Sequence, residues 1–126
     1  MDVPRLSLVI PAYNEEAYLP RLLDTVDVAR SRYEGGADAV EVIVSDNGST
    51  DATRDIAHRR GCRLAHQAVR NIAAVRNAGA AVARGRVLCF VDADLRVHPE
   101  TFNVIDRGLG PGVVAGATGV TLDRWS

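Results

Sequence analysis

The stretch VLCFVDAD, residues 87–94, places two aspartates directly after five apolar residues. The apolar run is short and apolar on both faces, which predicts a buried strand of a parallel sheet. Asp92 and Asp94 then lie at the carboxyl end of this strand, where ligands bind in open α/β sheets. Two carboxylates there can hold a hard divalent cation, and the cation can hold a phosphate. By itself, the pair fits a helix cap or a solvated turn equally well.

The composition is that of one globular domain, spanning residues 1–126. The chain is 47% hydrophobic and 25% charged, with a net charge of -1 at pH 7. Its basic residues are all arginines scattered among acids, so we expect no nucleic-acid partner. No leader-like or membrane-spanning run is evident, which predicts a cytoplasmic protein and leaves peripheral membrane contact open. Cys62 and Cys89 lack a paired metal spacing and are expected to be reduced structural residues.

Short apolar runs alternate along the chain with segments of helical apolar spacing. The expected strands are 6–10, 40–44, 63–67 and 87–91. Pro11 is expected to end the first strand, since proline has no backbone donor. The glycine-rich tail suggests a further strand or hairpin. This alternation predicts an α/β fold with a mostly parallel sheet, right-handed crossovers and flanking helices.

The expected helices have recognisable starts. Asn14, the segment 49–51 and Asn71 can cap the first three helices, and Pro99 can begin the fourth. The apolar positions of the first helix are Leu19, Leu22, Leu23, Val26 and Ala29. Acidic residues near the start of that helix would be favoured by its dipole.

Polar clusters follow three of the expected strands. They are PAYNE (residues 11–15), DNGSTD (46–51) and DAD (92–94). Because the carboxyl ends of parallel strands share one sheet edge, a single crevice can collect all three clusters. In this order, and together with RNAG (76–79), the segments closely resemble the family 2 glycosyltransferases of the GT-A fold. The resemblance runs from about Leu6 to Gly116.

This resemblance implies a Rossmann-like GT-A domain that binds a nucleotide-diphosphate sugar with Mg²⁺ or Mn²⁺, usually with inversion at the anomeric carbon. By similarity, the substrate-binding residues are Pro11, Ala12, Tyr13, Glu15, Asp46, Asn47, Arg76, Asp92 and Ala93. Asp46 would accept a hydrogen bond from the nucleobase. Asp94 would ligate the metal, with Asp92 facing the ribose or the metal. A cation held there can stabilise the charge that grows on the leaving β-phosphate.

The departures from the family pattern matter as well. Asn47 stands where the common form has a second aspartate, which leaves the base preference open. The family carries its catalytic base in an acceptor-binding second half, so we expect the base beyond Ser126 and assign no catalytic residue here. The sugar, the nucleotide, the glycan or lipid acceptor and the oligomeric state are not determined. TLDRW at 121–125 lacks the glutamine of the processive signature, and we reject that interpretation.

Several candidate residues have plain structural alternatives. Tyr13 can instead pack on the first helix, and Glu15 can serve the helix dipole. Arg76 can be a solvated arginine on an outer helix face. Ser49 and Asp51 are expected to act as helix caps rather than as ligand contacts.

Other functions fit parts of the sequence. Haloacid-dehalogenase-like phosphatases also carry Asp-x-Asp after an apolar strand, but residues 95–96 do not continue their motif and two earlier clusters stay unexplained. A dinucleotide-binding domain would need Gly-x-Gly-x-x-Gly after the first strand, where this chain has none. The stronger alternative is a non-catalytic donor-binding module, either shortened naturally or a fragment of a longer transferase. The ending at 124–126 favours a fragment.

Overall fold

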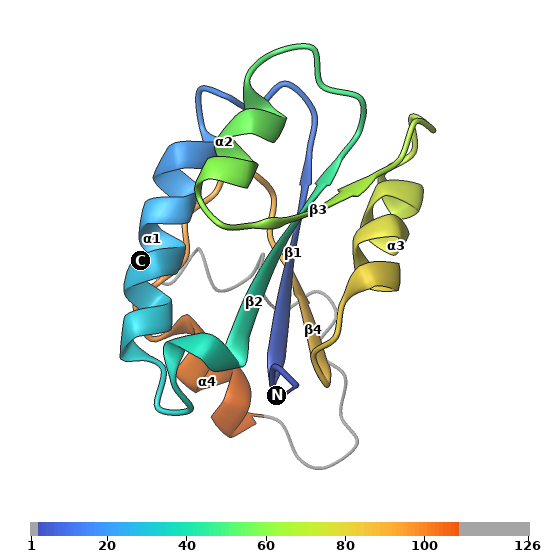
Figure 1. Cartoon of the computed structure of the whole chain (residues 1–126). Coiled ribbons are helices and arrows are strands. Elements are labelled where there is room, and N and C mark those ends of the chain that lie inside the picture. Colours follow the sequence, from blue (N-terminus) through green and yellow to red (C-terminus); the bar gives the residue numbers. More distant parts are fainter. Residues whose placement is uncertain (1–2, 109–126) are drawn as a thin grey trace.

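A four-stranded parallel sheet forms the centre of the computed structural model, which describes residues 3–108 (Figure 1). The strands are β1 (Leu6–Ala12), β2 (Val40–Asp46), β3 (Arg63–His66) and β4 (Val87–Phe90), in the spatial order β3-β2-β1-β4. The helices are α1 (Leu19–Arg32), α2 (Thr53–Arg59), α3 (Ile72–Val82) and α4 (Thr101–Gly108), with a 3-10 turn, η1 (Ala37–Ala39). The α/β class and the parallel sheet are confirmed.

The two faces of the sheet bury different cores. Leu8 and Ile10 of β1 belong to the larger core, which also contains residues of α1 and α4, whereas Val9 between them belongs to the smaller core on the other face. Figure 1 shows α1 and α3 on opposite sides of the sheet. The alternation of side chains along a strand explains this division. α1 buries the five positions predicted from helical spacing: Leu19, Leu22, Leu23, Val26 and Ala29.

On the opposite face, α3 lies very close to β1. A Cβ atom at Gly79 would collide with the side chain of Val9, so only glycine allows this approach. α3 begins as predicted, because the Asn71 side chain caps it by accepting the Ala74 N–H at 3.1 Å. This packing places the first turn of α3 beside the carboxyl ends of β1 and β2.

The prediction for the start of α1 was wrong in two respects. Pro11 does not end β1, because the strand continues to Ala12, whose carbonyl accepts the Asn47 N–H at 2.9 Å. Asn14 does not cap α1, which begins at Leu19 with Tyr18 as its N-cap and a proline in its first turn. That proline has a backbone angle suited to a helix start. Residues 13–18 instead form a loop, so the acids at 15 and 16 precede the helix.

The starts of α2 and α4 also differ from expectation. The N-cap of α2 is Ala52, which has no side-chain acceptor to offer. Asp51 contributes to the start of α2 by accepting the Thr53 N–H at 2.9 Å. Ser49 does not cap this helix, because its hydroxyl accepts the Asn14 N–H instead. α4 begins two residues after Pro99, which lies in the preceding turn. The strand or hairpin expected in the tail lies outside the described residues.

Both cysteines are free in the described part of the chain. Burial raises the thiol pKa of Cys62 to about 11 and that of Cys89 to about 12, as expected for inert structural residues. Across residues 3–108, we find no helix with the length and apolar character needed to span a membrane.

Candidate functional site

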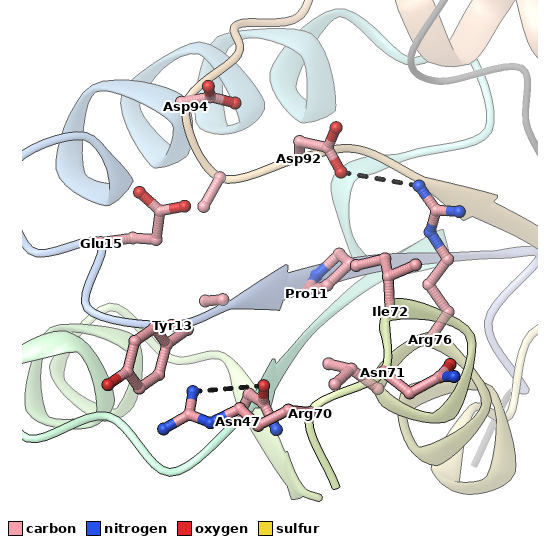
Figure 2. A pocket seen from close by; sticks show the side chains of 13 residues that line it. Pro11, Tyr13, Glu15, Asn47, Arg70, Asn71, Ile72, Arg76, Asp92 and Asp94 are labelled. Atoms are coloured by element: carbon pink, nitrogen blue, oxygen red, sulfur yellow. Dashed lines mark hydrogen bonds and ion pairs between the residues drawn. The ribbon is translucent and has the colours of Figure 1, made fainter.

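The three predicted clusters meet in one pocket of about 830 Å³ at the carboxyl edge of the sheet (Figure 2). The residues lining it are Pro11, Ala12, Tyr13, Glu15, Asn47, Arg70, Asn71, Ile72, Val75, Arg76, Asp92, Ala93 and Asp94. Of the predicted site residues, Asp46 alone lies behind this lining. The parallel order of β1, β2 and β4 explains the convergence, because each loop leaves the sheet at the same edge.

One side of the pocket is acidic, with the side chains of Glu15, Asp92 and Asp94 gathered there in Figure 2. Burial raises the pKa of the Glu15 carboxyl above its usual value, and the negative charges of Asp94, Asp92 and Asp51 raise it further. The carboxylates therefore repel one another, and a bound cation would relieve that repulsion. Within residues 3–108, no three acidic, histidine or cysteine side chains form a complete metal cage. A Mg²⁺ or Mn²⁺ ion held by these carboxylates would need further oxygen ligands, such as substrate phosphates or water.

Arg76 reaches this acidic side from α3. Its Nη2 lies 3.7 Å from Asp92 Oδ1, so the two side chains form an ion pair. Its Nε is buried and has no hydrogen-bond partner among the residues described. The side chain lines the pocket, which excludes the solvated outer face as its position. A partly exposed guanidinium that lines the pocket beside the acid pair is suited to an anionic ligand.

The opposite side of the pocket is formed by an aromatic ring and a cation. The Arg70 guanidinium carbon lies 3.7 Å from the centroid of the Tyr13 ring, a close cation–π stack. Tyr13 is 42% exposed and lines the pocket, so it does not serve mainly to pack on α1. Arg70 Nη1 also lies 3.5 Å from Asn47 Oδ1.

Asn47 ties this side of the pocket to β2. Its Nδ2 donates to the carbonyls of Gln67 and Val69, at 2.5 and 3.0 Å. A carbonyl only accepts, so both bonds require the amide NH₂ of an asparagine and would be lost with an aspartate. Asn47 thus anchors residues 67–71, the loop that carries Arg70.

Asp46 is 1% exposed and lies directly behind this wall. Its Oδ2 accepts the N–H groups of Gly48 and Ser49, at 3.1 and 3.0 Å. Its Oδ1 is buried and finds no hydrogen-bond partner in the described chain. Unpaired buried acceptors are rare and costly, so this atom calls for a functional explanation.

With this geometry in view, the sequence comparison is decisive: residues 7–105 match the sequence model of the family described as Glycosyl transferase family 2. The chain belongs to this family. Validoxylamine A glucosyltransferase of Streptomyces hygroscopicus subsp. limoneus is 38% identical over 104 residues, which are 78% of this chain and 22% of that protein. Dolichyl-phosphate beta-glucosyltransferase of Drosophila melanogaster is 38% identical over 99 residues, which are 71% of this chain and 30% of that protein.

Solved structures of glycosyltransferases share the fold. Mannosyltransferase PcManGT from Pyrobaculum calidifontis, in complex with GDP-Man and Mn²⁺, aligns with a TM-score of 0.73 at 25% identity, over 90% of this chain and 34% of that chain. Glucosyl-3-phosphoglycerate synthase from Mycobacterium tuberculosis, in complex with Mn²⁺, UDP and glucosyl-3-phosphoglycerate, aligns with a TM-score of 0.64 at 31% identity, over 87% of this chain and 42% of that chain. The GT-A fold prediction is confirmed. The chain spans only 22% to 30% of the two curated relatives.

Four pocket residues of this family 2 domain were missed by sequence reasoning. They are Arg70, Asn71, Ile72 and Val75, which belong to the end of the β3–α3 loop and the first turn of α3. Asn71 was recognised only as a helix cap. The sequence did contain a signal for these residues. The start of α3 follows a parallel strand, so it must lie near the carboxyl edge of the sheet, where ligands bind.

Proposed function

We propose that this chain is the donor-binding part of a metal-dependent family 2 glycosyltransferase, binding a nucleoside-diphosphate sugar in the pocket at the carboxyl edge of the sheet. One observation carries the proposal: an aromatic ring and a group of carboxylates face each other across a single pocket. A nucleotide sugar needs both kinds of wall, because its base stacks and its diphosphate binds through a cation. The Mn²⁺, UDP and GDP-Man bound by the neighbouring structures support this assignment.

The base would be held on the side formed by Tyr13, Asn47 and Asp46. The Tyr13 ring offers a stacking face, at present covered by Arg70. A base N–H would satisfy the unpaired Oδ1 of Asp46, provided that the 67–71 loop shifts to uncover this atom. Pro11 and Ala12 complete the floor of the pocket at the end of β1.

Asp94 and Asp92 would hold the divalent cation, which on binding acts as a Lewis acid for the charge that develops on the leaving β-phosphate. The loop carrying both acids is fixed from α1, because Arg21 Nη2 donates to the Asp94 carbonyl at 3.2 Å and Thr25 Oγ1 accepts the Val97 N–H at 3.1 Å. Arg76 balances the charge of Asp92, and its partly exposed guanidinium lines the pocket where a phosphate oxygen would lie.

Transfer would proceed with inversion to a glycan or lipid acceptor, using a base that we predict outside this chain. A binding module without transfer activity is the second candidate, favoured by the small share of the relatives that the chain spans. Cytoplasmic location and peripheral membrane contact stay predictions. The phosphatase and dinucleotide-binding alternatives gain no support, since the family match covers residues 7–105.

Calorimetric titration of the chain with UDP and with GDP, in the presence and absence of Mn²⁺, tests donor binding. We expect tighter binding with Mn²⁺, and Asp94→Asn should remove most of that gain, since even the groups that orient a metal ligand contribute on the order of 10- to 100-fold to metal affinity. Asp55→Asn is the matched control, because this exposed acid on α2 pairs with its helix neighbour Arg59, at 3.1 Å, and lies outside the pocket lining among residues 3–108. Equal affinity with and without cation would refute the metal assignment.

A second assay separates the two candidate functions. The chain is incubated with Mn²⁺, labelled sugar nucleotides, and lipid-phosphate and glycan acceptors. Multiple-turnover transfer would show that the chain supplies its own base. Binding without transfer is the result expected if the base lies elsewhere, because general base catalysis contributes typically about 10²- to 10⁴-fold.

A further inference from the structure

Three consecutive backbone N–H groups of the 13–18 loop, those of residues 14, 15 and 16, donate to side chains of the β2–α2 loop and of the first residue of α2. The acceptors, in that order, are Ser49 Oγ at 2.9 Å, Thr53 Oγ1 at 2.8 Å and Asp51 Oδ2 at 3.2 Å. We call these three side chains the loop clasp. The loop that supplies Tyr13 and Glu15 to the pocket is therefore held by side chains from another element.

A fourth bond runs in the opposite direction and fixes the turn of the loop. Asn14 has a φ of 51°, a left-handed conformation that asparagine adopts more readily than most residues. Its Oδ1 accepts the Thr50 N–H at 2.8 Å. This turn separates Tyr13, on the base side of the pocket, from Glu15, on the acidic side. The β2–α2 loop thus fixes the chain between two pocket residues.

Burial identifies Thr53 as the central member of the clasp. Its side chain is 0% exposed, and its hydroxyl accepts the Glu15 N–H while donating to Asp51 Oδ1. The Thr53 hydroxyl therefore has a protein partner on each side, and its burial keeps water from taking its place. Ser49 is buried as well. Neither residue lines the pocket as the described residues define it.

We propose that Ser49, Asp51 and Thr53 are positioning residues of the donor site, which set the places of Tyr13 and Glu15 by binding the backbone between them. The inference rests on the proposed donor-binding function. It assigns the polar residues after β2 a role beyond helix capping, to which Asp51 contributes by accepting the Thr53 N–H.

Thr53→Val tests this, because valine keeps the shape of the side chain and removes the hydroxyl. The Glu15 N–H then loses its acceptor, which lowers the fraction of molecules with a competent loop and should weaken UDP or GDP binding about 5- to 30-fold. The gain in affinity from Mn²⁺ should fall less than in Asp94→Asn, because Asp94 lies on a different loop and Glu15 is the acidic pocket residue on the loosened one. Thr53→Ser should restore binding to within about twofold of the original chain, because serine retains the hydroxyl acceptor.

Thr101→Val is the matched control. Thr101 is also a buried threonine, 1% exposed, but its hydroxyl has no partner within residues 3–108. Its replacement should leave nucleotide affinity unchanged. Unaltered affinity in folded Thr53→Val, equal losses in both valine variants, or failure of Thr53→Ser to rescue binding would each overturn the proposal.

Backbone amide exchange without nucleotide separates this inference from the proposed function. Thr53→Val should speed exchange at residues 14–16, and Thr101→Val should not. Unchanged exchange at residues 14–16 overturns the positioning role even if nucleotide binds. Faster exchange in a chain that binds neither UDP nor GDP supports the clasp as a structural device and overturns both the proposed donor site and the role of the clasp in it.

Discussion

Glu41 is expected to contribute strongly to stability, in a manner that depends on pH. The residue lies on β2 and its side chain is 7% exposed. Burial by itself would raise the pKa of this carboxyl, but hydrogen bonds from the Ser7 hydroxyl, the Arg84 N–H and the Arg63 guanidinium outweigh it and lower the pKa from 4.5 to about 2. A shift of this size corresponds to roughly 3 kcal/mol of stability when the group is ionised. The bond from the Arg84 N–H, at 2.6 Å, also fastens the connection between α3 and β4.

Glu41→Gln removes the negative charge. It also replaces one of the two accepting oxygens with an amide NH₂, which cannot accept from the donors of Ser7, Arg63 and Arg84. Because the folded pKa is depressed, the stabilisation is fully present above about pH 4.5 and is lost as the pH falls through about 2. Urea unfolding followed by far-UV circular dichroism should therefore show a loss of about 3 kcal/mol at pH 7 that shrinks below pH 4.5.

Glu34→Gln is the matched control for Glu41→Gln. The Glu34 side chain is 70% exposed and pairs with Arg107 at 3.2 Å. Such a surface pair is worth at most about 1 kcal/mol, so Glu34→Gln should change stability little. A Glu41→Gln variant as stable as the original chain at pH 7, or a loss independent of pH, would refute the reasoning.

Two further predictions concern the base side of the pocket. Asn47→Asp removes both donors to the carbonyls of the 67–71 loop, so amide exchange in that loop should become about 5- to 30-fold faster; unchanged exchange measured by mass spectrometry would contradict the anchoring role. Asp46→Asn keeps one oxygen as acceptor for the Gly48 and Ser49 N–H groups and replaces the unpaired oxygen with an NH₂ group. Because an NH₂ group cannot accept a base N–H, uridine or guanosine should bind about 5- to 30-fold more weakly even without metal. If calorimetry shows that only metal-dependent nucleotide binding falls, Asp46 does not contact the base.

Much of the fold could be predicted from the sequence, because its signals are local and periodic. The buried face of α1 followed from the spacing of Leu19 to Ala29, and β4 followed from the apolar run before Asp92. The cap at Asn71 was also predictable, since its side chain bonds within its own helix. Once the strands are parallel, the meeting of their polar ends at one edge follows from topology.

The partners of the polar side chains around the loops depend on contacts between segments that are distant in the sequence. Asn14, Ser49 and Asp51 have the chemistry of helix caps, yet the same oxygens can accept N–H groups of a neighbouring loop at similar energy. The packing of β1 beside β2 brings the two loops together and settles that choice. The position of Arg70 in the pocket likewise depends on a long-range contact. Its loop is anchored by Asn47, which lies 23 positions earlier in the chain. Local patterns carry no information about such contacts, because the free energy that selects them comes from neighbours distant in sequence.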